Sequence, residues 1–168
     1  MGKPSVSPMG IFAYVLAAAV VVLDQLSKWW VMEVVHLDQK GQIPVLPIFR
    51  LTAVMNRGVS FGLLRADNPA GRWILVLAAL IVVLALIWWV RNADRWLFAI
   101  SIGLVIGGAL GNNLIDRARL GQVVDFLDFS GLHFPWVFNV ADSAITVGVV
   151  LLLWDSFFPA KTTAGKTA

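Results

Sequence analysis

Long runs of uncharged, apolar residues constrain the fold of this chain more than any other feature. Three runs are clear: Pro4 to Leu23, Trp73 to Val90 and Trp96 to Ile115. A fourth, Phe134 to Trp154, is weaker because polar residues interrupt its first half. A helix of about 17–25 such residues spans the hydrocarbon core of a bilayer. The sequence therefore predicts an all-α integral membrane protein with four transmembrane helices.

Composition agrees with a membrane protein and excludes several kinds of site. Of the 168 residues, 59% are hydrophobic and 14% are charged, which lies outside the usual range of soluble domains. There are no cysteines, so disulfides, thiolate metal sites and cysteine nucleophiles are excluded. The two histidines are far apart in the sequence, so neither a metal nor another cofactor is expected. The basic residues are scattered, and nucleic acid is therefore not an expected partner.

The two longer connections between the predicted helices carry the rest of the fold. Residues 43–54 are rich in β-formers and contain prolines, which predicts a small sheet at the membrane interface, and residues 56–62 follow with turn chemistry. Four helices place both connections on one side and both termini on the other. The basic N-terminus and the basic turn 91–95 favour cytoplasmic termini. We expect one membrane-embedded domain over residues 1–168, with helices at about 10–32, 72–90, 95–115 and 138–158.

Ionisable side chains gather toward the loop-side ends of the predicted helices. A charge is costly to bury in a membrane, so such residues are candidates for function. Asp24 and Lys28 are four residues apart and can pair along one helix face, which favours a structural role. Asp116 can anchor the end of the third helix to neighbouring elements. Arg117 can either anchor that end or hold a ligand, because a guanidinium suits carbonyl, carboxylate and phosphate oxygens.

Asp125 and Asp142 differ from these residues because each is the polar member of an apolar setting with no adjacent base. Two carboxyls brought together at a dry site cannot both ionise easily. One then keeps a proton and acts as an acid, while the other acts as a base on water. This pair would equip an aspartic protease. Asp128, three residues after Asp125, is the competing candidate.

Two other classes of protein fit part of the same pattern. A small proton-coupled transporter would also use paired carboxylates inside the membrane. A carrier needs its charges near the bilayer midplane, however, whereas these charges gather at one end of the helices. A purely structural membrane subunit is the third alternative, and its carboxyls would be replaceable without loss of any activity.

Four blocks of the sequence, in this order, resemble the lipoprotein signal peptidases, also called signal peptidase II. They are Asp24–Lys28 (DQLSK), Asn56–Gly62 (NRGVSFG), Gly107–Arg117 followed by Val124–Phe126 (VDF), and Phe138–Ser143 (FNVADS). The resemblance implies a four-helix aspartic endopeptidase of the bacterial inner membrane. Such an enzyme removes the signal peptide from diacylglyceryl-modified prolipoproteins and cuts just before the lipidated cysteine. It also implies an extracytoplasmic β-cradle and an interfacial lid over about residues 42–70, with the active site near that face.

The resemblance also assigns roles to individual residues and partners. It implies that Asp125 and Asp142 are the catalytic dyad. Besides the lipidated substrate, it implies contact with membrane lipids, inhibition by globomycin-like cyclic peptides and a monomeric enzyme. The substrate site that it implies consists of Asn56, Gly58, Asn113, Arg117 and Asn139.

The chain departs from the family pattern at one point. The family block runs Gly-Asn-x-x-Asp-Arg, whereas this chain has one residue more between Gly111 and Asp116. Anchoring the block on Asp116 and Arg117 selects Asn113 as the ligand-contacting asparagine. Anchoring it on the glycines selects Asn112 instead, so the residues alone leave both open.

Overall fold

The computed structural model describes residues 6–58 and 69–158. Within these ranges, four helical segments are long and apolar enough to cross a membrane. The predicted number of transmembrane helices is therefore confirmed. The four segments are Pro8–Val34, Pro69–Val90, Trp96–Leu120 and Val140–Phe157.

Two of these segments change their helical type along their length. The first consists of α1 (Pro8–Trp29) and a π-helical turn, η1 (Trp30–Val34). The third consists of α4 (Trp96–Ala109), the π-helix η3 (Leu110–Arg117) and the short α5 (Ala118–Leu120). This segment therefore continues past residue 115, where the predicted helix ends. Three charged residues, Asp116, Arg117 and Arg119, lie inside this helical segment.

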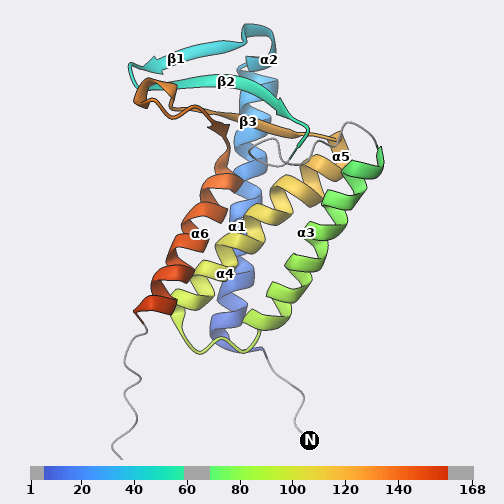
Figure 1. Ribbon diagram of the computed structural model, residues 1–168, viewed down its shortest axis with the longest axis vertical. Coiled ribbons are helices and arrows are strands. Elements are labelled where there is room, and N and C mark those ends of the chain that lie inside the picture. Colours follow the sequence, from blue (N-terminus) through green and yellow to red (C-terminus); the bar gives the residue numbers. More distant parts are fainter. Residues whose placement is uncertain (1–5, 59–68, 159–168) are drawn as a thin grey trace, which may run out of the picture.

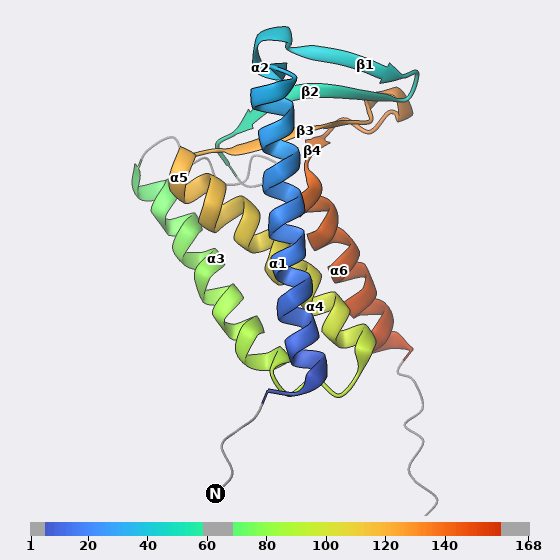
Figure 2. The same ribbon diagram turned by 180° about the vertical axis from the view of Figure 1, so that it is seen from behind.

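The other two segments are regular helices, α3 (Pro69–Val90) and α6 (Val140–Phe157). Figure 1 shows α1, α3, α4 and α6 side by side, with a sheet across one end of the bundle. In both views α1 begins and α6 ends at the opposite end (Figures 1 and 2). The arrangement agrees with two long connections on one side of four antiparallel helices.

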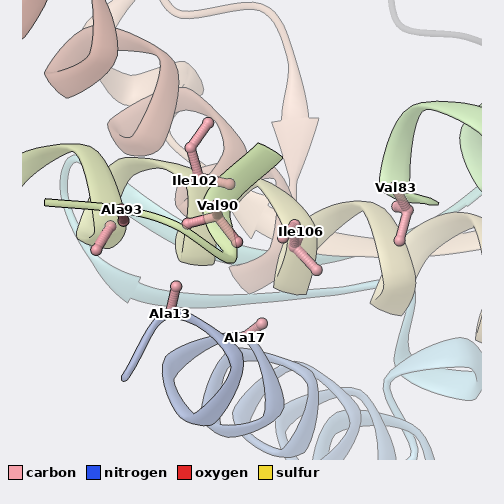
Figure 3. Close-up of a cluster of buried hydrophobic side chains, with 8 residues drawn as sticks. Ala13, Ala17, Val83, Val90, Ala93, Ile102 and Ile106 are labelled. Carbon is pink, nitrogen blue, oxygen red and sulfur yellow. The ribbon is translucent and has the colours of Figure 1, made fainter. Parts of the chain in front are cut away.

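The core of the bundle lies where α1, α3 and α4 meet. Small residues allow these helices to approach closely; a Cβ atom added to Gly107 of α4 would lie 2.6 Å from the Cβ of Val20 in α1. The segment Trp96–Leu120 is the most buried of the four, so α4 is the central helix. Figure 3 shows part of the buried cluster, which consists of Ala13, Ala17, Val83, Val90, Ala93, Ala99, Ile102 and Ile106.

The sheet has four strands in the order β1-β2-β3-β4, and each neighbouring pair is antiparallel. The strands β1 (Gln42–Leu46) and β2 (Phe49–Asn56) form the small sheet that the sequence predicts. The strands β3 (Val123–Asp128) and β4 (Val137–Phe138) complete it, although the sequence analysis left this region as a connection without strands. The short helix α2 (Leu37–Lys40) precedes β1, and a 3-10 turn, η4 (Ser130–Leu132), follows β3.

The sheet brings distant parts of the chain together at the end of the bundle. Strand β2 pairs with β3 so that Val54 lies opposite Asp125 and Asn56 lies opposite Val123. The predicted lid falls largely on residues 59–68, which lie outside the described residues, and it stays a prediction.

Candidate active site

The two candidate catalytic aspartates line one cavity at the sheet end of the bundle. Asp125 lies on β3 and Asp142 lies in the first turn of α6, so a strand and a helix present them from different sides. The cavity has a volume of about 210 Å³. Its other lining residues are Asn56, Gly58, Asn112, Asn113, Arg117, Val123 and Ile145.

Local structure fixes Asp142 through the N-terminus of α6. Asn139 is the N-cap residue, and its side-chain oxygen accepts a hydrogen bond from the backbone N–H of Asp142 at 2.9 Å. In return, the Asp142 Oδ2 atom accepts from the backbone N–H of Asn139 at 3.2 Å. This reciprocal capping box ties the carboxylate to the helix end, where a negative charge is favoured.

Each of the four carboxyl oxygens of the aspartate pair accepts a hydrogen bond from an asparagine. Asp125 Oδ1 accepts from Asn139 Nδ2 at 2.7 Å, and Asp125 Oδ2 accepts from Asn56 Nδ2 at 3.0 Å. Asp142 Oδ1 accepts from Asn112 Nδ2 at 2.8 Å, and its Oδ2 atom is held by the Asn139 backbone. Among the described residues, no lysine or arginine forms an ion pair with either carboxyl. Neutral amides, rather than cations, therefore orient the pair.

The surroundings of Asp125 favour a bound proton near neutral pH. Only 2% of the residue is exposed, and this burial raises the pKa of the Asp125 carboxyl to about 7. The negative charge of Asp142 contributes to this rise in pKa, while the hydrogen bonds from Asn56 and Asn139 and the charge of Lys28 oppose it. Asp125 can therefore serve as a proton donor at the pH of a living cell.

Arg117 lines the cavity and keeps one buried donor without a partner among the described residues. Its guanidinium donates from Nη2 to the Gly58 carbonyl at 2.8 Å and from Nε to Asn113 Oδ1 at 3.3 Å. Its Nη1 atom is buried and has no hydrogen-bond partner among the described residues. A buried donor of this kind can satisfy an oxygen of a bound ligand.

A buried ionic cluster joins α1 to η3 near the two aspartates. Lys28 Nζ lies 2.7 Å from Asp24 Oδ2 and 2.8 Å from Asp116 Oδ2. The backbone N–H of Ala141 donates to Asp24 Oδ1 at 3.0 Å. All three charged residues are at most 4% exposed. The cluster therefore links α1, η3 and the start of α6, and Lys28 also donates to Asn112, which lines the cavity.

Asp128, the competing candidate, is not among the residues that line this cavity. Its position three residues after Asp125 puts it on the other face of β3, since side chains alternate along a strand. There its Oδ2 atom accepts from Thr52 Oγ1 at 2.6 Å, and its Oδ1 atom accepts from the backbone N–H of Ser130 at 2.8 Å. The Thr52 hydrogen bond lowers the pKa of Asp128. The geometry therefore favours Asp125, not Asp128, as the partner of Asp142.

Residues 16–158 match the family model described as signal peptidase (SPase) II. The chain belongs to the signal peptidase II family. The lipoprotein signal peptidase of Caulobacter vibrioides is 54% identical over 157 residues, which cover 94% of this chain and 93% of that protein. The lipoprotein signal peptidase of a Shewanella species is 43% identical over 162 residues, with the same coverage. A solved structure of a bacterial membrane enzyme gives a TM-score of 0.75 at 26% identity, covering 95% of this chain and all of that one.

Membership of the signal peptidase II family establishes what the chain does. It is a peptidase of the aspartic type that removes signal peptides from prolipoproteins. With its four candidate membrane-spanning helices, it is a multi-pass protein of the bacterial inner membrane. Among the described residues, there is no group of three or more His, Cys, Asp or Glu that could hold a metal ion.

The extra residue of the signal peptidase II block falls within the π-helix η3. A π-helix bonds residue i to i+5, so its turn holds about one residue more than an α-helical turn. Gly111 can therefore pack against Asp24, where an added Cβ would lie 2.7 Å from Oδ2, while Asp116 still reaches Lys28. Both ends of the block keep the positions that their contacts require.

In the same π-helix, the two adjacent asparagines have different hydrogen-bond partners. Asn112 donates to Asp142, while the side-chain oxygen of Asn113 accepts from Arg117 at 3.3 Å. Both line the cavity. Asn112 was expected only as the alternative to Asn113, from the alignment of the block on its glycines. Asn139, expected at the substrate, is fully buried and donates to Asp125 from behind the cavity.

Proposed function

We propose that Asp125 and Asp142 are the catalytic dyad with which this signal peptidase hydrolyses the signal peptide bond. The observation that carries the proposal is their common cavity, in which amide groups hold all four carboxyl oxygens. Carboxyls fixed in this way need no reorganisation when charge develops on the substrate. Asp128 lacks this setting, because it lies outside the cavity.

The resting proton is assigned to Asp125, whose burial favours the neutral acid. Asp142, at the N-terminus of α6, then carries the negative charge. The ionised carboxylate takes a proton from water as the water oxygen bonds to the scissile carbonyl carbon, and the acid gives its proton to the carbonyl oxygen. The carboxyl that took the proton from water then gives it to the amide nitrogen as the C–N bond breaks. A hydroxyl of the tetrahedral diol returns a proton to the other carboxyl as the new carboxyl group of the product forms.

The substrate backbone is proposed to lie against the cavity wall formed by Asn56, Gly58, Asn113 and Arg117. The support is the unpartnered, buried Nη1 atom of Arg117, which can donate to a peptide carbonyl. Asn139 contributes to the same site indirectly, because its side chain holds the Asp125 carboxyl. The proposed substrates are diacylglyceryl-modified prolipoproteins, cut just before the lipidated cysteine.

The remaining features of the proposal concern the membrane. Both termini are placed in the cytoplasm, with the dyad and the β-cradle near the extracytoplasmic face, where lipidated substrates are available. The basic residues of the turn between α3 and α4, Arg91 and Arg95, support this orientation. We further propose that the enzyme is a monomer, that a lid closes over the cavity, and that globomycin-like cyclic peptides inhibit the enzyme.

The dyad is tested with purified protein in detergent and a lipidated prolipoprotein, with the released signal peptide measured by mass spectrometry. Asp125→Asn and Asp142→Asn should each abolish cleavage, since an amide cannot exchange the proton. The double variant should be scarcely worse than either single one, because the two carboxyls act as a unit. Asp128→Asn should remain active. If Asp128→Asn is inactive while Asp125→Asn still cleaves, the dyad has been misassigned.

The orientation can be tested directly because the chain contains no cysteine. Asn92, in the α3–α4 turn, and Gln39, in α2, are exposed positions at opposite ends of the molecule. Each is replaced by cysteine in a separate variant. In intact spheroplasts, a membrane-impermeant maleimide should label the cysteine at position 39 and not the one at position 92. The reverse pattern would place the active site on the cytoplasmic side.

A further inference from the structure

A buried lysine reaches toward the dyad without touching it. Lys28 is 4% exposed, and its ammonium group has three hydrogens to donate. Three acceptors surround it: Asp24 Oδ2 at 2.7 Å, Asp116 Oδ2 at 2.8 Å and Asn112 Oδ1 at 2.8 Å. Two of these contacts are ion pairs that serve the fold. The third connects the ammonium to the side chain that holds Asp142.

The contacts of Asn112 allow its amide only one orientation. Its Oδ1 atom accepts from Lys28 Nζ at 2.8 Å and from Asn139 Nδ2 at 3.0 Å. Its Nδ2 atom donates to Asp142 Oδ1 at 2.8 Å. A flipped amide would place its NH₂ group against two donors and its oxygen against a carboxylate. Lys28 and Asn139 together therefore fix the side-chain oxygen of Asn112, so that Asn112 turns an N–H toward Asp142.

We propose that Lys28 and Asn112 are positioning residues of the cleavage reaction, in which the ammonium fixes the Asn112 amide and the amide fixes the charge and orientation of the Asp142 carboxylate. The inference rests on the proposed catalytic role of Asp142. Asn139 extends the same connection to the other carboxyl, because its Nδ2 atom contacts Asn112 Oδ1 at 3.0 Å and Asp125 Oδ1 at 2.7 Å. One buried ammonium thereby acts on both members of the dyad.

The charges around the dyad predict how its pH dependence responds. Asp24 and Lys28 of α1 and Arg117 of η3 face the dyad, with Asp116 next to Arg117, and β2 contributes the neutral Asn56. Removing the Lys28 charge, or the Asn112 N–H, takes away stabilisation of the ionised dyad. The dyad then holds its protons up to a higher pH, and both limbs of the pH–rate profile move in the alkaline direction.

Asn112→Ala is the decisive variant, because it leaves both ion pairs of Lys28 in place. We expect kcat to fall about tenfold or more, with a smaller change in KM, since the lost hydrogen bond is to a charged group. Both limbs of the pH profile should move upward by about 0.5–1 unit. If kcat falls while the limbs stay in place, Asn112 is only structural and the proposal is wrong.

Lys28→Met should move both limbs of the pH profile in the same direction. The double variant with Lys28→Met and Asn112→Ala should move them little further than either single one, because both changes remove the same connection. Lys28→Met also leaves Asp24 and Asp116 unpaired, so where it does not fold, Asn112→Ala alone decides. The matched control is Asp155→Asn, which breaks the 2.8 Å ion pair between Arg95 and the buried Asp155 at the other end of the bundle. It should lower stability without moving either limb.

The outcomes separate this proposal from the assignment of the dyad. We call the connection from Lys28 through Asn112 to Asp142 the relay. If Asp125→Asn and Asp142→Asn are inactive while Asn112→Ala behaves as the unmodified enzyme, the relay is refuted and the dyad assignment remains. If either aspartate variant still cleaves, the dyad assignment fails and the relay loses its basis. Unmoved limbs in both Lys28→Met and Asn112→Ala would likewise refute the relay.

Discussion

Removing the carboxyl of Asp125, one member of the proposed dyad, should make this enzyme more stable at neutral pH. The pKa of Asp125 is about 7 in the folded protein, against 3.8 for an unperturbed aspartate. Below about pH 4, the carboxyl is protonated in both the folded and the unfolded chain, and burial of the neutral acid costs little. As the pH rises toward 7, the unfolded chain loses this proton and the folded chain keeps it. The free energy of unfolding therefore falls over this window.

The size of the effect follows from the two pKa values. Their difference of about three units corresponds to at most about 4 kcal/mol, at about 1.4 kcal/mol per unit. Asp125→Asn removes this cost because an amide does not ionise. The new Nδ2 group, however, faces one of two donors, Asn139 Nδ2 or Asn56 Nδ2, so one hydrogen bond is lost at a cost of about 1–3 kcal/mol. A net gain of about 2 kcal/mol above pH 7 remains.

Thermal unfolding in detergent, measured from pH 4 to pH 8, tests this sign. A gain of about 2 kcal/mol raises Tm by about 4–8 °C in a chain of this length. We expect Asp125→Asn to melt above the unmodified enzyme at pH 8 and slightly below it at pH 4, so that the two curves cross. Loss of stability at every pH would refute the reasoning, because burial of the Asp125 charge would then carry no cost.

Asp128→Asn is the control of opposite sign. The hydrogen bond from Thr52 lowers the pKa of Asp128, so its ionised form stabilises the fold above the ordinary pKa of an aspartate. This contribution is lost as the pH falls through the lowered pKa. Asp128→Asn should therefore melt below the unmodified enzyme at pH 8, and the difference should shrink toward acid pH.

Three further outcomes concern the reaction. Cleavage should persist in EDTA, since Arg117 beside the carboxyls disfavours a divalent cation; inhibition that is reversed by added metal would contradict the dyad mechanism. Arg117→Gln should raise KM by about tenfold or more through loss of a charged donor to the substrate, measured by steady-state cleavage. An unlipidated precursor should be cut far more slowly than the lipidated one, because acyl chains contribute roughly 0.8 kcal/mol per buried methylene; equal rates would exclude lipid anchoring as the basis of specificity.

The four helices, and Asp125 and Asp142 as the aspartates that line one cavity, could be predicted from the sequence, because each depends on a local property. A run of apolar residues is sufficient to indicate a transmembrane helix. A carboxyl in an apolar setting is sufficient to mark Asp125 and Asp142 as candidates. Strand β3 could not be found in this way, since its six residues, VVDFLD, form a short apolar run that periodicity cannot assign. Its pairing with β2 is a contact between distant parts of the chain.

The end of the third helix shows how tertiary contacts override a local rule. The prediction ended this helix at Ile115 because a charge is costly in lipid. In the structure it continues through Asp116 and Arg117 to Leu120. Lys28 neutralises Asp116 at 2.8 Å, and Arg117 turns toward the cavity, so neither charge faces lipid. Such pairing depends on α1, which no pattern within the third helix reveals.

The geometry of the π-helix η3 predicts that one residue can be deleted from it without loss of the fold. Removal of either asparagine of the Asn112–Asn113 pair gives the same sequence, with the family spacing Gly-Asn-x-x-Asp-Arg. A deletion in a regular helix rotates everything beyond it by about 100°. In η3 the turn can instead tighten from i+5 to i+4 bonding, so that Gly111 still meets Asp24 and Asp116 still meets Lys28.

We therefore expect the variant with one asparagine to accumulate in the membrane and to cleave a lipidated prolipoprotein at a rate within about tenfold of the unmodified enzyme. The single remaining asparagine then takes the place at Asp142 that Asn112 holds now. Deletion of Val83, a buried residue of the regular helix α3, is the matched control and should abolish accumulation, because no π-helical turn in α3 can absorb the rotation. If both deletion variants fail to accumulate or to cleave, the extra residue is needed for the site itself. The claim that η3 can lose one residue and keep the contacts of the block would then be wrong.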